Sequence, residues 1–161
     1  MLQPALIAGL NKLPNHHYTY DLLIYAHQLN EAKELIKQVS SDLPIVIDHI
    51  AKPDIKNSEI AEWKKGITAL AQYPNVYCKI SGMVTEADWK NWTMATLQPY
   101  LDTVVEAFGT ERILFGTDWP VCLVASTYST WLNGIQNYFN TFSISEQENI
   151  FANNAIKFYK I

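Results

Sequence analysis

Four short apolar runs recur along this chain, and a segment with helical periodicity precedes each of them. The runs are DLLIYA, PIVIDH, NVYCKIS and RILFGTD, at residues 21–26, 44–49, 75–81 and 112–118. Their bodies are continuously apolar rather than alternating, which is typical of parallel strands buried on both faces with helices as crossovers. We therefore predict an α/β fold with a parallel sheet, formed by residues 1–161 as one domain.

The helices expected between the strands follow from apolar spacing and from end signals. We predict helices over residues 2–13, 29–39, 58–72 and 88–108, with Gly109 as the C-cap of the fourth. Further helices close the chain, and Ser145 with Glu148 predicts a capping box at the start of the penultimate one.

Charge and cysteine content exclude several classes of protein. The net charge is −4 with 12 basic residues, and no Lys/Arg cluster exceeds a pair, which argues against nucleic-acid binding. No apolar run approaches membrane-spanning length, and the first residues do not resemble a signal peptide. Cys78 and Cys122 lie far apart without a C-x-x-C motif. They predict buried free thiols in a reducing compartment, and hence a cytoplasmic protein.

Polar side chains gather where the predicted strands end. His27 follows the first strand, His49 the second and Asp118 the fourth, while Lys79 lies near the end of the third. In parallel α/β folds, binding and catalysis occur at these carboxyl ends. Each residue also has a structural interpretation: a hydrogen-bonded histidine, a turn aspartate, or a lysine that reaches water or a carboxylate. Together they predict a cluster suited to a divalent metal or to acid–base chemistry.

Five segments, taken in order, resemble one enzyme family. DLLIYAHQL, PIVIDHIAKP, VYCKISGM, RILFGTDWPVCLVAS and NNAIKFY are similar to the amidohydrolase-related lactonases, the group that includes L-fuconolactonase, L-rhamnonolactonase and 2-pyrone-4,6-dicarboxylate lactonase. Those enzymes are (β/α)8 TIM barrels of roughly 250 residues or more. The resemblance implies that this chain is the C-terminal half of such a barrel, strands five to eight with their helices.

The resemblance also implies a site and a reaction. His27, His49 and Asp118 match residues that face a metal or the substrate, so a divalent metal, zinc by preference, or no metal at all is expected. Asp118 would be the general base in hydrolysis of a sugar-acid lactone in carbohydrate metabolism, with His49 as its catalytic partner. Lys79, Lys52 and Trp119 are predicted substrate contacts by position. The His-x-His pair of the family's first strand is absent from this chain.

Three functions remain open from the sequence. The first is a lactone hydrolase acting on a small-molecule lactone or sugar acid. The second is a non-oxidative decarboxylase of the same superfamily, and the third is a non-catalytic fragment that needs a partner half. Four parallel strands of a barrel would leave two unpaired edges, which predicts either a homo-oligomer or a missing N-terminal half.

Overall fold

The computed structural model describes all residues, 1–161, and contains one four-stranded sheet. The strands are β1 Tyr20–Leu22, β2 Ile45–Ile47, β3 Val76–Ile80 and β4 Ile113–Phe115. They lie in the order β1-β2-β3-β4, and all three pairings are parallel, as the apolar runs predict. β1 and β4 each pair on one side only, so the sheet has two open edges.

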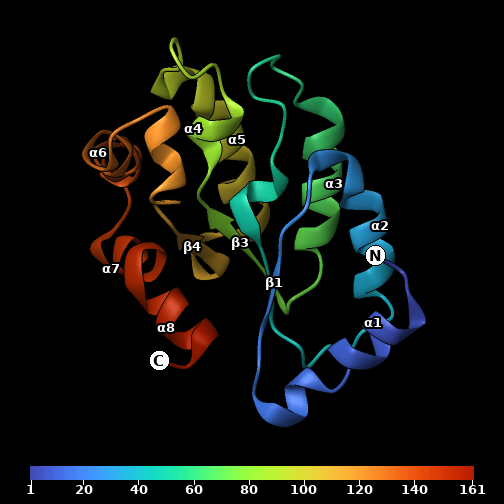
Figure 1. The fold of residues 1–161 in the computed structure, drawn as a ribbon. Helices are drawn as coiled ribbons and strands as arrows, with labels where there is room; N and C mark the ends of the chain where they lie inside the picture. The colour runs from blue at the N-terminus through green and yellow to red at the C-terminus, as the bar shows by residue number, and fades with distance from the viewer.

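Helices connect the strands, as the chain path in Figure 1 shows. The longer ones are α2 Leu29–Ile36, α3 Ala61–Ala71, α5 Met94–Phe108 and α6 Tyr128–Phe139. The shorter ones are α1 Pro4–Leu10, α4 Met83–Glu86, α7 Ile144–Glu148 and α8 Asn154–Tyr159, the last two joined by a π-helical segment, Asn149–Asn153. No helix is both long enough and apolar enough to cross a membrane.

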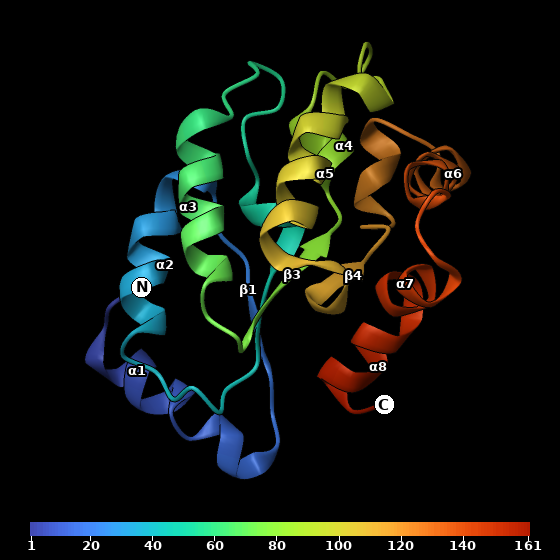
Figure 2. The ribbon, with the colours of Figure 1, turned by 180° about the vertical axis from the view of Figure 1, so that it is seen from behind.

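The two faces of the sheet have different partners. One face carries Ile45, Cys78 and Ile113, which belong to the main core beneath α2, α3 and α5; Figure 2 shows these helices in front of the strands. On the other face, Val46 and Leu114 pack with α8. This second, narrower cluster lies on the same side of the strands as Lys79, which pairs in register with Leu114.

Several helix boundaries differ from the sequence prediction, and the helices expected over 29–39 and 58–72 are shorter, at Leu29–Ile36 and Ala61–Ala71. The helix expected over 88–108 begins only at Met94, because Thr93 caps it and the side chain of Asp88 folds the preceding segment into a turn. The helix expected over 2–13 shortens to Pro4–Leu10. The capping box uses Ser143 and Glu146 rather than Ser145 and Glu148, because Ser143 has the extended backbone that an N-cap requires.

The two cysteines are buried and free, as expected. Burial raises the pKa of the Cys78 thiol far above its usual range, so this thiol stays protonated and unreactive. Cys78 and Cys122 therefore act as small apolar core residues.

Candidate active site

His49 lies in a turn, Asp48–Ala51, that follows β2 directly. Its imidazole is held on both sides: Nδ1 is 2.8 Å from Ser81 Oγ at the end of β3, and Nε2 is 3.7 Å from Asp118 Oδ1 beyond β4. Three different strand ends therefore converge on one ring. The sequence prediction that His49 and Asp118 meet at the carboxyl edge of the sheet is consistent with this arrangement.

Asp118 is the third residue after β4 and has a left-handed backbone, with φ of 55°. Its side chain is 15% exposed, so the carboxylate lies partly withdrawn from water. The main-chain oxygen of Asp118 accepts a hydrogen bond of 2.9 Å from the amide of Cys122, which closes the loop behind it. The backbone thus fixes the position of Asp118, and this hydrogen bond does not use the oxygens of its carboxylate. The carboxylate can therefore accept a proton or a hydrogen bond from a ligand beside His49.

The protonation state of His49 follows from its neighbours. Burial lowers the pKa of His49, although the charges of Asp118 and Asp48 oppose that shift. The neutral ring has one N–H, and the carboxylate of Asp118 can only accept. The favourable tautomer therefore carries the proton on Nε2, facing Asp118, while Nδ1 accepts from the hydroxyl of Ser81.

Ser81 and Gly82 are site residues that the sequence did not single out. Ser81 is only 1% exposed, and its hydroxyl meets the His49 ring. Gly82 has φ of +63°, and a Cβ there would lie 2.8 Å from Cγ and Nδ1 of His49. The only sequence signal for Ser81 and Gly82 was their position directly after an apolar strand. Ser81 lies 32 residues from His49 in the chain, and the two come into contact only because β2 pairs with β3.

We expect Gly82→Ala to displace the His49 ring. Gly109→Ala is the matched control, because Gly109 has φ of +62° but no atom within 4 Å of the added Cβ. Both variants pay a backbone strain of the order of 1–3 kcal/mol, measurable by urea denaturation. If His49 acts in catalysis, only Gly82→Ala should also lose activity, about 100-fold for a displacement of about 1 Å. Equal activity in the two variants would contradict a role for Gly82 in placing His49.

The structure does not bring His27 to this pair. The chain leaves β1 through a 3-10 turn, Ala26–Gln28, and the exposed His27 ring stacks on Tyr25 with centroids 5.8 Å apart. No three His, Cys, Asp or Glu side chains lie close enough together to hold a metal ion. Within this chain, therefore, His27, His49 and Asp118 do not gather into one cluster, and the ligand set stays a prediction.

The number of possible metal ligands near His49 decides whether a catalytic zinc ion fits this site. Catalytic zinc sites use three protein ligands and an open position. His49 and Asp118 supply two donors, and no third ligand side chain accompanies them. These residues alone do not fit a catalytic zinc centre, and the chemistry open to them is that of the side chains themselves.

The three predicted substrate contacts have different surroundings. Lys79 lies between two carboxylates, with Nζ 2.8 Å from Asp21 Oδ2 and 2.6 Å from Asp48 Oδ1. Lys52 pairs with Glu86 at 2.9 Å. Trp119, next to Asp118, is 64% exposed and remains open to a ligand.

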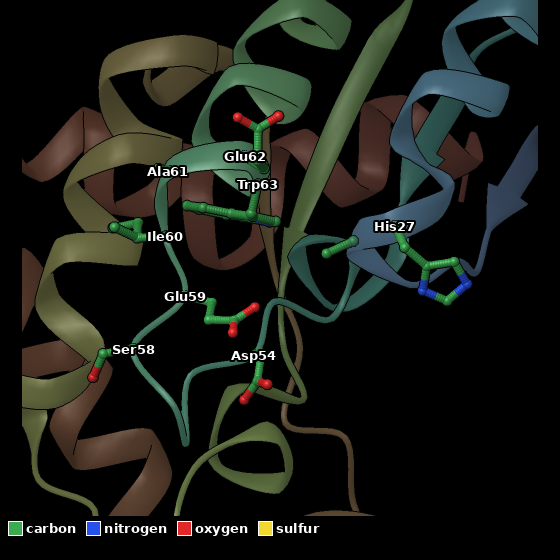
Figure 3. Close-up of a pocket in the computed structure, with 9 residues that line it drawn as sticks. His27, Asp54, Ser58, Glu59, Ile60, Ala61, Glu62 and Trp63 are labelled. Atoms are coloured by element: carbon green, nitrogen blue, oxygen red, sulfur yellow. The ribbon is translucent and has the colours of Figure 1, made fainter.

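A separate pocket of about 500 Å³ lies between His27 and the start of α3. Figure 3 shows Asp54 and Glu59 in this region, with the His27 ring pointing away from them. The pocket shares no residue with the His49–Asp118 pair, and no three of its His, Asp or Glu side chains could hold a metal ion together. The facing histidine and aspartate therefore lie at the strand ends and not in this pocket.

Polar side chains at the carboxyl ends of parallel strands are the arrangement from which (β/α)8-barrel enzymes build their active sites. Comparison with known proteins agrees: residues 15–161 match the family model described as Amidohydrolase, and the chain belongs to that family. The predicted relation to the amidohydrolase-related lactonases is confirmed.

The relatives identify the branch of the family. The chain is 31% identical over 163 residues to the L-fucono-1,5-lactonase of Burkholderia multivorans. This alignment covers 95% of this chain and 55% of the relative. It is 26% identical to the L-rhamnono-gamma-lactonase of Scheffersomyces stipitis, over 98% of this chain and 54% of the relative. The chain thus spans about half the length of the curated relatives that it matches.

Solved structures show the same half. Two crystal structures of an amidohydrolase from Burkholderia multivorans, one with bound HEPES and one with bound zinc, superpose with TM-scores of 0.94. They are 28% and 30% identical and cover 99% of this chain, but this chain covers 58% of theirs. The predicted fold is confirmed: the four-stranded sheet matches part of the amidohydrolase TIM barrel, consistent with its C-terminal half.

Proposed function

We propose that this chain carries the Asp–His half of a lactonase site and that the complete enzyme hydrolyses a sugar-acid lactone. The observation that supports this most directly is the facing pair of His49 and Asp118 at the carboxyl edge of the sheet. The sequence similarity to an L-fucono-1,5-lactonase and an L-rhamnono-gamma-lactonase supports the proposal independently.

In this proposal the two side chains have complementary roles. Asp118 accepts a proton from a water molecule as that water attacks the lactone carbonyl, and then delivers it to the departing ring oxygen. His49, protonated on Nε2, donates a hydrogen bond to the carbonyl oxygen and stabilises the negative charge that develops there. The 3.7 Å between Nε2 and Oδ1 is too long for a good direct hydrogen bond, so both groups remain available to a ligand.

The remaining residues of the proposed site bind and orient. Trp119 offers an exposed aromatic face beside Asp118 for the apolar side of a sugar ring. Lys52 is a further proposed contact for a hydroxyl or carboxylate, provided that the substrate competes with Glu86 for its ammonium group. His49 and Asp118 could also contribute two ligands to a metal site that further chain would complete.

Assembly belongs to the same proposal, because β1 and β4 each have one unpaired edge. An active barrel needs further strands at these edges, supplied by a second copy or by the other half of the domain. Exposed apolar side chains occur in the segments that follow the two edge strands, Leu23 and Tyr25 after β1, and Val121 and Leu123 after β4. These side chains would be covered in such an assembly.

We expect aldonolactones to be hydrolysed with saturable kinetics by the assembled protein. The assay is acid release at constant pH, with L-fucono- and L-rhamnonolactones as substrates and with the mass of the assayed sample established by sedimentation. His49→Gln should lose most of the activity, since an amide in place of the imidazole alters both the donor and its placement. A correctly folded assembly that leaves every aldonolactone intact would refute the proposed function.

A further inference from the structure

The ammonium group of Lys79 is held by two carboxylates of the chain itself, which a substrate-binding lysine would not require. Lys79 lies on β3 and faces away from the main core, with its side chain 19% exposed. Its ammonium group contacts Asp21 Oδ2 at 2.8 Å and Asp48 Oδ1 at 2.6 Å, so two carboxylates from β1 and the end of β2 share it. The two negative charges more than compensate the ammonium group, so the cluster as a whole is negative and has no positive charge left for an anionic ligand.

A tyrosine from the far end of the chain completes this cluster. The hydroxyl of Tyr159 donates to Asp21 Oδ2 at 2.7 Å, across 138 residues, and its ring centroid lies 5.6 Å from Lys79 Nζ. The neighbouring Phe158 packs on Tyr77 of β3 with centroids 5.0 Å apart. The last turn of α8 is therefore fixed to the same face of the sheet as Lys79.

The charges of the cluster are stable at neutral pH. Burial by itself would lower the pKa of Lys79, but the hydrogen bond that its ammonium group donates to Asp21 and its close contact with the carboxylate of Asp48 outweigh burial and raise that pKa above its usual range. Burial and the bond to Asp21 raise the pKa of Tyr159 to about 12. Lys79 is thus always an ammonium group and Tyr159 always a neutral donor.

Asp48 connects this cluster to the catalytic histidine. It is the first residue of the turn that carries His49, and the four residues from His49 to Lys52 all have positive φ, between 44° and 61°. Left-handed backbone at residues other than glycine costs roughly 1–2 kcal/mol per residue. Such a turn needs fixed contacts to persist, and Lys79 on Asp48 is one of them.

We propose that Lys79 is a positioning residue, which Asp21 and Tyr159 hold and which fixes Asp48 and thereby the His49 turn. In this role it does not contact the substrate, in contrast to the contact predicted from its place in the sequence. The inference rests on the proposed function in one respect, namely that His49 takes part in the reaction. The C-terminal helix then contributes to the geometry of the site without contributing a catalytic residue.

Nuclear magnetic resonance of the free chain tests this proposal without any substrate. The signals are the His49 ring and the amides of residues 48 and 49, with His49→Gln used to assign the ring. Tyr159→Phe removes one hydroxyl and keeps the packing of α8, so the variant is expected to fold. Tyr138→Phe is the matched control, because its hydroxyl donates to Asp102 at 2.6 Å in a pair of the same kind between α5 and α6.

The expected result is a shift of these signals in Tyr159→Phe, a larger shift in Lys79→Met, and none in Tyr138→Phe. Unchanged His49 signals in both Tyr159→Phe and Lys79→Met would overturn the proposal. Urea denaturation of the same samples shows whether a general loss of stability accounts for the shifts. Shifts of equal size in Tyr138→Phe would also overturn it, because the effect would then not pass through Lys79.

Kinetics of the assembled protein separate positioning from substrate binding. Positioning predicts that kcat falls about 3- to 10-fold in Tyr159→Phe and about 10- to 100-fold in Lys79→Met, with KM unchanged. A raised KM in Lys79→Met and wild-type kinetics in Tyr159→Phe would assign Lys79 to the substrate and refute positioning. If the wild-type protein hydrolyses no lactone, the proposed function fails, while the resonance experiment still decides the role of Lys79.

Discussion

Asp118→Asn is expected to reduce lactone hydrolysis by about 10²–10⁴-fold, the range over which a positioned general acid–base group contributes. The substitution keeps the shape of the side chain but removes the group that takes a proton from water. It also removes the carboxylate whose charge raises the pKa of His49, so that pKa falls further and the imidazole remains neutral. The loss is therefore attributable to Asp118 rather than to protonation of His49. Acid release from an aldonolactone measures it.

Asp102→Asn is the control for this experiment. Asp102 is exposed on α5 and accepts the Tyr138 hydroxyl, away from the strand ends. It should retain wild-type activity, which shows that removing one carboxylate is harmless in itself. Comparable activity in Asp118→Asn would show that another base activates the water, and the proposed mechanism would then be incorrect.

Trp131→Ala is expected to have the largest effect on stability, about 3–5 kcal/mol of the free energy of unfolding. Trp131, in α6, is fully buried, and its indole N–H reaches the carbonyl oxygen of Gly116 at 3.3 Å. Gly116 directly follows β4, two residues before Asp118. The truncation thus opens a cavity next to the segment that leads to Asp118, the proposed general base, and we expect activity to fall together with stability.

Trp89→Ala provides the comparison at a surface position. Trp89 is 55% exposed, and its indole N–H donates to the carbonyl oxygen of Thr85. Its loss should change the free energy of unfolding by about 1 kcal/mol or less. Urea denaturation of both variants gives the difference. Similar costs for the two truncations would mean that α6 does not form part of the core as described.

The strands and the edge on which the site lies could be predicted from the sequence. Short apolar runs at 45–47, 76–80 and 113–115, interrupted only by Lys79, indicate the buried strands of a parallel sheet, and the parallel pairing follows from the helices between them. Because the carboxyl ends of parallel strands share one edge, His49 and Asp118 could be placed on it together. The helix boundaries were harder to predict from the sequence, because capping by Thr93 and Ser143 depends on the local backbone conformation.

Only the tertiary structure determined which polar residues at that edge face one another. His27 and His49 are equivalent in sequence, each following an apolar strand, but the chain turns His27 onto Tyr25 and His49 toward Ser81 and Asp118. A strand fixes the position of the residue that follows it, whereas the direction of its side chain depends on the next few backbone angles and on neighbours far along the chain. The sequence by itself thus determined the parallel sheet and the edge that bears the site. The pairing of His49 with Asp118, and the enclosure of Lys79 by Asp21, Asp48 and Tyr159, depended on contacts between segments as much as 138 residues apart.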